Sequence, residues 1–406
     1  MLRRIAVRRI RRHVTDPSCS RASGVDRRPR VRGGPVDRPG GTRVPGERVP
    51  SASFQQAARR KGSVISASTD PKTVRELGEF ALIDRINAGR VQAPGVLLGP
   101  GDDAALVAAP DGRFVVTTDM LVQDRHFRLD WSGPEDIGRK AIAQNAADVV
   151  AMGAVPTAFV VALGCPADTP LELIDGLADG MWAEAARAGA SIAGGDLVRS
   201  RDLVISVTAF GDLRGGAPIT RSGARVGDIV AVAGRLGWSA AGLDAFSAGV
   251  TGAEVAEALA AHRVPQPPYA AVLDALRRGP GATAGSPEAG PHALTDVSDG
   301  LLADLGHVAT ASGVAIALNS AALRDPALER VAVALDADAA QWILTGGEDH
   351  AFAGTWAPGR PLPAGWVAIG HVVAGHGLTV DGVAQTGDGG WESFRGAAWA
   401  TGDQPR

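Results

Sequence analysis

From residue 73 onward, segments whose apolar positions have the period of a helix alternate with segments that have the pattern of a strand. Thr73 and Glu76 match a capping box at the start of a predicted helix that ends at Gly89. The apolar stripe of this helix consists of Val74, Leu77, Phe80 and Ile83. Residues 114–117 then form a short apolar run, which predicts a strand.

The segments that follow continue this exchange of helix and strand. Residues 132–135 match a second capping box, which predicts a helix up to Met152. Residues 156–163 predict a buried strand, residues 169–189 predict a helix, and residues 203–210 alternate like a half-buried strand. This order of elements predicts an α/β or α+β fold.

The composition divides the chain into three predicted parts. Residues 1–68 are rich in Arg, Pro, Gly and Ser, which predicts a disordered basic extension. A boundary near residues 211–217 separates a predicted α/β domain over residues 73–215 from a second one over residues 216–400. In the second domain, the glycine-rich segment 234–242 opens a helix and fits either a phosphate site or a simple tight turn.

Acidic residues recur beside glycines or after apolar runs. They are Asp102, Asp103, Asp119, Asp196, Asp296, Asp299, Glu348 and Asp349. A carboxylate at the end of a buried strand is costly for folding unless something binds it. Hard cations such as Mg2+ take oxygen ligands and usually bind substrate phosphates as well. The alternative is that these residues only cap turns and helices.

Asn145 and Asp148 lie three residues apart in the helix predicted to end at Met152, so both side chains point to one side. Their neighbours are small, which lets another backbone or a metal cluster approach: Ala143, Ala146, Ala147 and Ala151. A solvated helix face is the alternative, but an unpaired carboxylate on an apolar face is rare. We therefore expect Asp148 to join the acidic residues above.

The charge of the chain is unevenly distributed. Residues 1–50 hold 14 arginines, no lysine and four acidic residues, and the whole chain has a net charge of −3, so the remainder carries −13. An acidic folded part argues against a nucleic-acid surface. The two cysteines, Cys19 and Cys165, indicate neither a disulfide framework nor a zinc site and fit a reducing compartment. No run of 18 apolar residues is present, so no membrane span is predicted.

The acidic positions fit Mg2+ ions that carboxylates hold on behalf of phosphates. Phosphoryl transfer depends mainly on positioning and charge neutralisation. The only lysines are Lys61, Lys72 and Lys140, and the chain has no Walker A sequence. Because lysines are so few, metal ions and some arginines must neutralise the phosphates, which favours more than one Mg2+.

Together these motifs resemble those of the thiamine-monophosphate kinase family, within the superfamily of aminoimidazole ribonucleotide synthetase and selenophosphate synthetase. The resemblance covers about residues 73–396. It rests on Gly-Asp-Asp-Ala-Ala at 101–105, Thr-Thr-Asp-Met-Leu-Val at 117–122, His-Phe at 126–127, the helical stretch 140–154, Gly-Gly-Asp at 194–196, Thr-Arg-Ser-Gly-Ala at 220–224, Asp-Val-Ser-Asp-Gly-Leu at 296–301 and Gly-Gly-Glu-Asp at 346–349.

The resemblance implies a two-domain aminoimidazole ribonucleotide synthetase-like fold, in which the N-terminal halves of a homodimer close a barrel. It implies cytoplasmic transfer of a phosphoryl group from ATP to thiamine monophosphate, which yields thiamine diphosphate. The implied Mg2+ ligands are Asp103, Thr117, Thr118, Asp119, Asp148, Asp196, Asp296 and Asp299. The implied ATP contacts are Gly195, Asp196, Arg221 and Ser298, and the implied thiamine-monophosphate contacts are His126, Glu348 and Phe394.

Two positions depart from the family pattern, and three other functions compete with it. His350 and Trp391 each stand where the family has tyrosine. A sister synthetase depends on a reactive cysteine, which this chain lacks in a suitable place. A non-catalytic nucleotide sensor would have lost the carboxylates that bind metal. A plain cation buffer would need no arginine that contacts a nucleotide. A phosphate acceptor, with a second pKa of about 6, is ionised at neutral pH, so no general base is expected.

Overall fold

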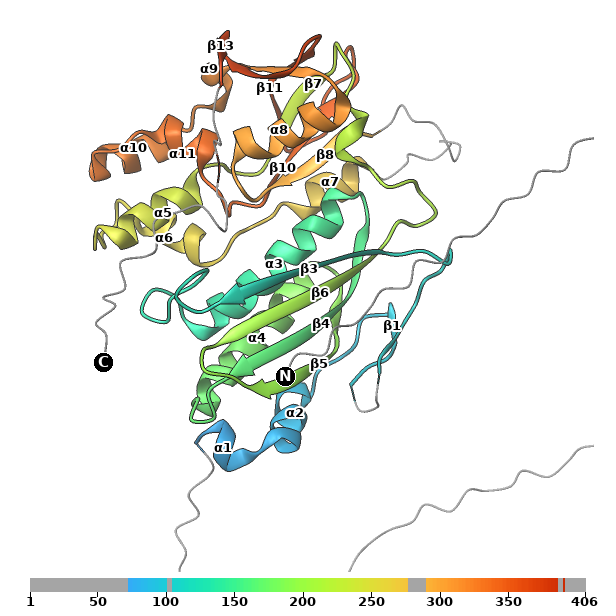
Figure 1. Ribbon diagram of the computed structural model, residues 1–406, viewed down its shortest axis with the longest axis vertical. Coiled ribbons are helices and arrows are strands. Elements are labelled where there is room, and N and C mark those ends of the chain that lie inside the picture. The colour runs from blue at the N-terminus through green and yellow to red at the C-terminus, as the bar shows by residue number, and fades with distance from the viewer. Residues whose placement is uncertain (1–71, 101–103, 277–289, 386–389, 391–406) are drawn as a thin grey trace, which may run out of the picture. The chain divides into compact units, whose positions relative to one another are not determined.

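The computed structural model describes residues 72–100, 104–276, 290–385 and 390 (Figure 1). The described residues belong to one compact unit. The predicted basic extension over residues 1–68 lies outside the described residues, and so do Asp103 and Phe394. Within the described ranges, no helix combines the length and the apolar character that crossing a membrane requires.

A four-stranded sheet with two long helices forms the N-terminal half. Its strands follow the order β3-β6-β4-β5, with β4 and β5 parallel and the other neighbours antiparallel. A two-stranded sheet, β1-β2, accompanies it. The elements are α1 (Val74–Leu77), α2 (Glu79–Asn87), β1 (Val96–Leu98), β2 (Leu106–Val107), β3 (Val115–Val122), α3 (Pro134–Ala151), β4 (Val155–Cys165), α4 (Leu171–Arg187), β5 (Ser191–Arg199) and β6 (Val204–Asp212).

The first predicted helix is in fact two helices. The Thr73 hydroxyl accepts a hydrogen bond from the Glu76 N–H, as the capping box predicted. However, α1 ends at Gly78, whose φ of 84° lies in the left-handed region and interrupts the helical path. Because α2 begins anew, the predicted stripe does not hold: Phe80 is 80% exposed, whereas Leu82 is buried.

The strand predicted over residues 114–117 is longer than expected. β3 extends to Val122, and its exposed and less exposed residues alternate through Asp119. Asp119 therefore lies within a strand rather than after one. The prediction failed because a carboxylate was taken as the end of the apolar run, although the period of two continues through it.

Helices α3 and α4 pack at very short range. A Cβ atom at Gly138 would lie 2.1 Å from the Leu177 carbonyl oxygen, and one at Gly180 would lie 2.0 Å from the Glu135 carbonyl oxygen. Only glycine fits at these two crossing points. The start of α3 follows the prediction closely, although the Asp136 carboxylate, rather than Glu135, accepts from the Gly133 N–H at 3.2 Å.

A seven-stranded sheet forms the C-terminal half, in the order β13-β12-β9-β11-β7-β10-β8. Only the β12–β9 pair is parallel. The elements are the short 3-10 helix η1 (Arg221–Gly223), β7 (Ile229–Ala233), α5 (Trp238–Ser247), α6 (Ala256–Arg263), α7 (Tyr269–Ala275), β8 (Ala293–Val297), α8 (Leu301–Ser312), β9 (Ala315–Leu318), α9 (Ser320–Leu323), α10 (Pro326–Leu335), α11 (Ala339–Thr345), β10 (Ala351–Trp356), β11 (Trp366–Val373), β12 (Gly377–Val380) and β13 (Val383–Ala384).

Helix α3 connects the cores of the two halves. Its residues Ile142 and Ala146 belong to the same buried apolar cluster as Leu294 of β8 and Phe352 of β10. A second cluster joins the seven-stranded sheet to α5, α8, α10 and α11. Figure 1 shows α3 running between the strands of the two sheets. Since the core continues across both halves, the domain boundary near residues 211–217 stays a prediction.

Candidate active site

The first polar contacts of the site join β3 to α3. Thr117 Oγ1 donates a hydrogen bond to Asp148 Oδ2 at 2.9 Å, and the Asp119 N–H donates to Asn145 Oδ1 at 3.0 Å. Thr117 and Asp119 share one side of β3 because side chains alternate along a strand. The prediction that Asn145 and Asp148 point to one side of their helix is confirmed.

Three carboxylates lie close enough to influence one another's ionisation. Burial, followed by the negative charges of Asp296 and Asp119, raises the pKa of Asp148 to about 7. Burial also raises the pKa of Asp119, and the charge of Asp296 adds to that effect. Because a nearby cation favours the ionised carboxylates, this donor set suits a hard divalent ion.

His350, one of the two departures from the family pattern, contacts this carboxylate group directly. Its Nδ1 atom lies 3.1 Å from Asp296 Oδ2, and both side chains are buried. Burial alone would lower the pKa of His350, but the hydrogen bond and charge of Asp296 outweigh it and raise that pKa. His350 and Glu348 both have positive φ, 51° and 65°, so the loop that carries them is strained.

Asp304 is a buried residue of the site that the sequence did not single out. Its Oδ2 atom accepts hydrogen bonds from the N–H groups of Ser298, Asp299 and Gly300 at 3.0, 3.0 and 3.2 Å. It therefore holds the loop after β8 in place from the first turn of α8. The signal for it was an acidic residue in the first turn of a helix, where such residues commonly bind free N–H groups.

The predicted acceptor residues His126 and Glu348 lie near a buried lysine. Lys140 Nζ lies 3.0 Å from Glu348 Oε2, and the two side chains are 3% and 35% exposed. Burial alone would raise the pKa of Glu348, but the charge of Lys140 outweighs it and lowers that pKa. Burial lowers the pKa of His126, whose Nδ1 accepts from the Val122 N–H at 3.0 Å. Near pH 7, Glu348 is ionised and His126 is neutral.

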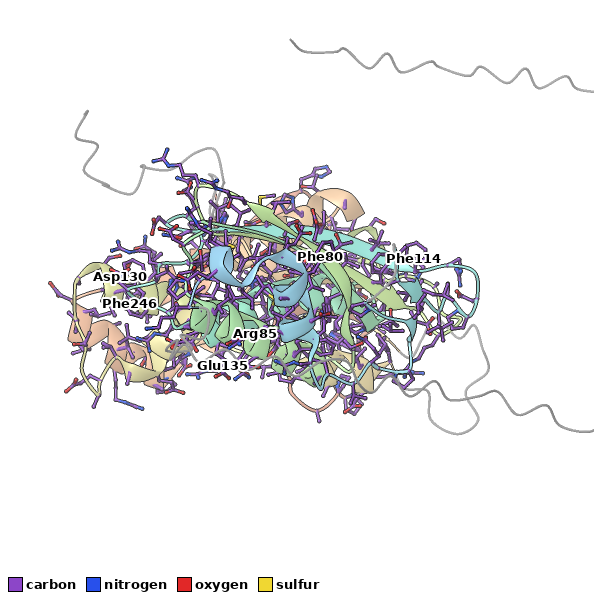
Figure 2. The ribbon with its side chains drawn as sticks, turned by 90° about the horizontal axis from the view of Figure 1, so that it is seen from below. Phe80, Arg85, Phe114, Asp130, Glu135 and Phe246 are labelled. Atoms are coloured by element: carbon purple, nitrogen blue, oxygen red, sulfur yellow. The ribbon has the colours of Figure 1, made fainter. Side chains whose placement is uncertain are left out.

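An aromatic contact joins the loop after β3 to the C-terminal half. The rings of Trp131 and Phe246 are stacked at 5.0 Å with an interplanar angle of 9°, and His262 meets Trp131 edge to face. Arg263 Nε donates a hydrogen bond to the Trp131 carbonyl oxygen at 2.6 Å. Figure 2 shows Phe246 beside the loop that carries Asp130. The loop next to His126 is thus anchored to α5 and α6.

The glycine-rich segment 234–242 favours the tight-turn alternative over a phosphate site. The half-buried carboxylate of Asp349 accepts hydrogen bonds from the Gly237 N–H at 2.5 Å and the Ser239 N–H at 2.8 Å. These are the first N–H groups of α5, which a phosphate would otherwise use. A protein carboxylate therefore already fills this helix terminus.

The remaining predicted metal residues lie on the other face of the four-stranded sheet. Met120, Ser206, Ala162 and Asp196 are paired across the four strands, so their side chains point to one face. Thr118 shares that face, because it lies two residues before Met120. Asp119 lies between them and points the opposite way, toward α3. Thr118 and Asp196 are thus separated by the sheet from Asp119 and Asp148.

The residues predicted to contact ATP are divided between the four-stranded sheet and the C-terminal half. Gly195 lies in β5, where a Cβ atom would come within 2.0 Å of the Val161 carbonyl oxygen. Arg221 and Ser298 belong to the C-terminal half. Arg221 Nε donates to Thr295 Oγ1 at 3.3 Å, one residue before Asp296. Burial and, after it, the negative charge of Asp296 raise the pKa of Asp299. The positive charge of Arg221 offsets part of that increase.

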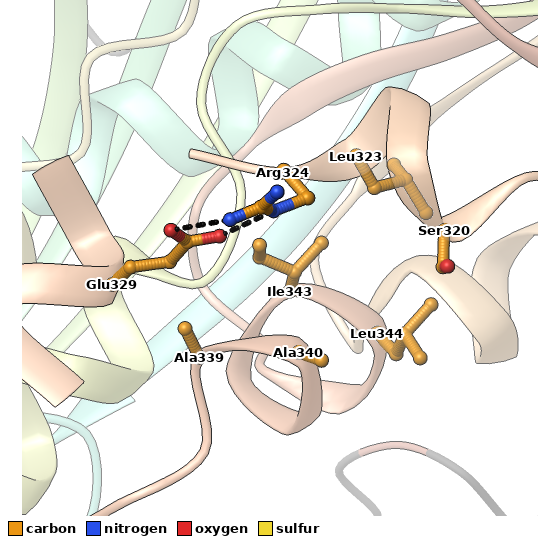
Figure 3. A pocket seen from close by; sticks show the side chains of 8 residues that line it. All are labelled: Ser320, Leu323, Arg324, Glu329, Ala339, Ala340, Ile343 and Leu344. Atoms are coloured by element: carbon orange, nitrogen blue, oxygen red, sulfur yellow. Dashed lines mark hydrogen bonds and ion pairs between the residues drawn. The ribbon is translucent and has the colours of Figure 1, made fainter. Parts of the chain in front are cut away.

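Among the described residues, no three His, Cys, Asp or Glu side chains already converge as a metal-binding group. Asp103 lies outside the described ranges. A shallow pocket elsewhere, between α9, α10 and α11, is lined mainly by apolar side chains and the Arg324–Glu329 ion pair, and it contains none of the predicted site residues (Figure 3).

Comparisons with known proteins identify the family of this chain. Residues 101–213 match the family model described as AIR synthase related protein, N-terminal domain. The thiamine-monophosphate kinase of Mycobacterium tuberculosis is 56% identical over 333 residues, which are 81% of this chain and 95% of that protein. The corresponding enzyme of Corynebacterium glutamicum is 41% identical over 335 residues, 80% of this chain and 96% of that protein.

Solved structures of the same enzyme share the fold. The thiamine-monophosphate kinase of Stenotrophomonas maltophilia is 35% identical, with a TM-score of 0.65 over 76% of this chain and 98% of that one. A structure described as AaThiL complexed with AMPPCP and TMP is 27% identical, with a TM-score of 0.61 over 80% of this chain and 99% of that one. The predicted family and the mixed α/β fold are confirmed.

Proposed function

This chain belongs to the thiamine-monophosphate kinase family, and from that premise we propose that it transfers the γ-phosphoryl group of ATP to thiamine monophosphate. The observation that carries the proposal is that Asp119, Asp148 and Asp296 lie close together beside α3. The acceptor candidates His126 and Glu348 lie in loops near Lys140 of the same helix. Two bound molecules in a related structure, AMPPCP and TMP, support the same pair of substrates.

We propose that Mg2+ ions bind to Asp119, Asp148, Asp296 and Asp299, with Asp103 as a further ligand. When bound, they neutralise the phosphates and the charge that develops during transfer. Ser298 and Arg221 would contact the nucleotide, and Asp304 would hold the backbone of the Ser298–Gly300 loop beneath it. Asp119, Asp148 and Asp296 lie on β3, α3 and β8, three regular elements, which favours fixed positions for the reacting groups.

The acceptor needs orientation rather than activation. Its phosphate monoester has a second pKa of about 6, so its oxygen is already a nucleophile at neutral pH. Neutral His126 can bind the phosphate by hydrogen bonding, and ionised Glu348 complements the positive thiazolium ring. We propose no general base, because no side chain of the site has to remove a proton.

We also propose a homodimer that uses the uncovered face of the four-stranded sheet. On β3, this face exposes Val116 and Met120, at 53% and 52%, on either side of Thr118, and on β5, at the opposite edge of the sheet, it exposes Asp196. An apolar face of this kind is typical of an interface. Thr118, Gly195 and Asp196 would then lie at the contact with the second copy. Two widely spaced cysteines, with Cys165 buried and unpaired, favour a cytoplasmic location.

Product analysis with purified protein tests this proposal. The protein is incubated with ATP, Mg2+ and either thiamine monophosphate or free thiamine, and the products are separated chromatographically. We expect thiamine diphosphate from the monophosphate and little or no product from thiamine, whose hydroxyl group would need a base. Rates should fall below about pH 6 as the acceptor protonates. Efficient phosphorylation of free thiamine would refute the acceptor and the base-free mechanism.

A further inference from the structure

Lys140 is unusual among the charged residues of this chain. It is one of three lysines in the sequence, and its side chain is 3% exposed on α3. The only other lysine within the described ranges, Lys72, is exposed. Burying an ammonium group costs several kcal/mol unless a partner compensates it. The Lys140–Glu348 ion pair at 3.0 Å supplies that compensation.

The partner of Lys140 is held from two other directions. The Glu348 N–H donates to the Ser298 carbonyl oxygen at 2.7 Å, and the backbone at Glu348 has a φ of 65°. A Cβ atom at the preceding Gly347 would lie 2.7 Å from the same carbonyl oxygen. The backbone of this loop is therefore fixed against the loop after β8, and Lys140 fixes the side chain.

The charge of Lys140 also reaches the neighbouring histidines. After burial, Lys140 is the largest cause that lowers the pKa of His262, which falls to about 4. It also acts to lower the pKa of His126. Lys140 therefore acts on the Glu348 carboxylate and on both imidazoles of this side of the site.

The position of Lys140 in α3 gives the ion pair a second consequence. Asn145 and Asp148 follow it on the same helix, and they contact the metal-side strand β3. A rigid helix thus spans the distance between the metal-side residues and the carboxylate expected to bind the acceptor. The position of the metal-side residues relative to the Glu348 carboxylate is therefore set by helix α3 instead of by two loops.

We propose that Lys140 is a positioning residue that holds the Glu348 carboxylate for the thiazolium of the acceptor and so determines acceptor affinity. This inference rests on the proposed function. Lys140 does not touch the reacting atoms in this proposal and acts through Glu348 alone. Its loss should therefore affect acceptor binding far more than ATP binding or the rate at saturating substrate.

A double-mutant cycle tests the proposal through Lys140→Met, Glu348→Gln and the combined variant. Lys72→Met serves as the matched control, because it removes an exposed lysine. For each protein, kcat and the KM values for thiamine monophosphate and ATP are measured together with Tm. We expect Lys140→Met to raise the acceptor KM about 10- to 100-fold, the size typical of a lost charge-assisted contact. The ATP KM and kcat should change by less than about threefold.

The combined variant separates positioning from a merely structural role. If Lys140 acts through Glu348, Lys140→Met/Glu348→Gln should have the acceptor KM of Glu348→Gln alone, because the two effects are not independent. Its Tm should exceed that of Lys140→Met, since no unpaired carboxylate remains. If Lys140→Met does not fold, the comparison of the combined variant with Glu348→Gln still decides.

Two results would overturn the inference. One is an unchanged acceptor KM in folded Lys140→Met; the other is an acceptor KM in the combined variant well above that of Glu348→Gln. Either leaves the proposed function intact as long as the unaltered protein phosphorylates thiamine monophosphate. Absence of that activity in the unaltered protein would refute the proposed function, and the inference with it.

Discussion

The two faces of the four-stranded sheet differ although they are built from the same strands. On the face toward α3, Thr117 and Asp119 contact Asp148 and Asn145. On the other face, Thr118 lies between the exposed apolar residues Val116 and Met120. Neighbours in the sequence therefore belong to different environments. The adjacent Thr117 and Thr118 of one chain cannot turn their side chains toward the same metal ion.

The seven-stranded sheet shows that the uncovered face is not simply a property of strands in this protein. β8 and β10 are buried at every residue, because helices or α3 cover both sides. β3, in contrast, has exposed residues at every second position over most of its length. The alternation along β3 therefore marks one covered and one exposed side of the first sheet, and the predictions below test what each of its faces does.

The largest expected effect comes from the covered face. Asp148→Asn should lower kcat by roughly two to four orders of magnitude, because it removes a charge that would bind Mg2+. The same change should raise the Tm of the metal-free protein by a few degrees, since it removes a buried charge and the repulsion by Asp296 and Asp119, which together raise the pKa of Asp148 to about 7. Steady-state kinetics and calorimetry measure both.

Asp168→Asn is the control for this substitution, because Asp168 is exposed in the turn after β4. It should leave kcat and Tm within error of the unaltered protein. Near-normal kcat for Asp148→Asn at saturating Mg2+ would remove Asp148 from the metal site. A lowered Tm would contradict the claim that its ionised form is held against repulsion.

The next effect concerns the uncovered face. Met120→Glu should convert the proposed dimer to a monomer and reduce activity about 10- to 100-fold, because it places charge in a desolvated interface. Val333→Glu is the control: Val333 is 84% exposed on α10, away from this sheet. Light scattering gives the mass of each variant. A monomeric unaltered protein, or a dimer that tolerates Met120→Glu, would refute this interface.

The sequence predicted much of this arrangement, and its failures have physical reasons. The i, i+3 spacing placed Asn145 and Asp148 on one side of α3 without any tertiary information. The separation of Thr117 from Thr118 was missed because the strand was ended too early, at residue 117. The partner of Lys140 is 208 residues away in the chain, and no local pattern links two residues so distant. Spacing within an element can be deduced from sequence; contacts between elements depend on packing.

A smaller effect is expected from pH. A carboxyl group whose pKa is raised in the folded state removes stability as pH rises from its ordinary pKa of 3.8 toward about 7. A bound cation offsets that loss but must displace the proton below pH 7. Mg2+ should therefore raise Tm more at pH 8 than at pH 6. Thermal shift with and without Mg2+ measures the difference.

Asp148→Asn provides the matched control for the pH experiment, because it has no proton to displace at this position. Most of the pH dependence of the Mg2+ effect should disappear in this variant. Equal Mg2+ shifts at pH 6 and pH 8 in the unaltered protein would show that Asp148 is not among the groups that bind the ion.

The smallest effect separates the two faces at adjacent positions. Thr117→Val removes the hydrogen bond to Asp148 and should raise the Mg2+ concentration for half-maximal activity about three- to tenfold, since one charge-assisted bond that orients a ligand is lost. Thr118→Val removes the hydroxyl that donates a hydrogen bond to the Val207 carbonyl oxygen and accepts one from the Thr208 hydroxyl. It should instead weaken the dimer slightly at low protein concentration.

The two substitutions are chemically identical and one residue apart, so the side of the sheet is the variable that differs between them. If both variants shift the Mg2+ requirement equally at a concentration where the dimer is intact, the two faces serve one site across the dimer, and the functional division drawn within a single chain is wrong.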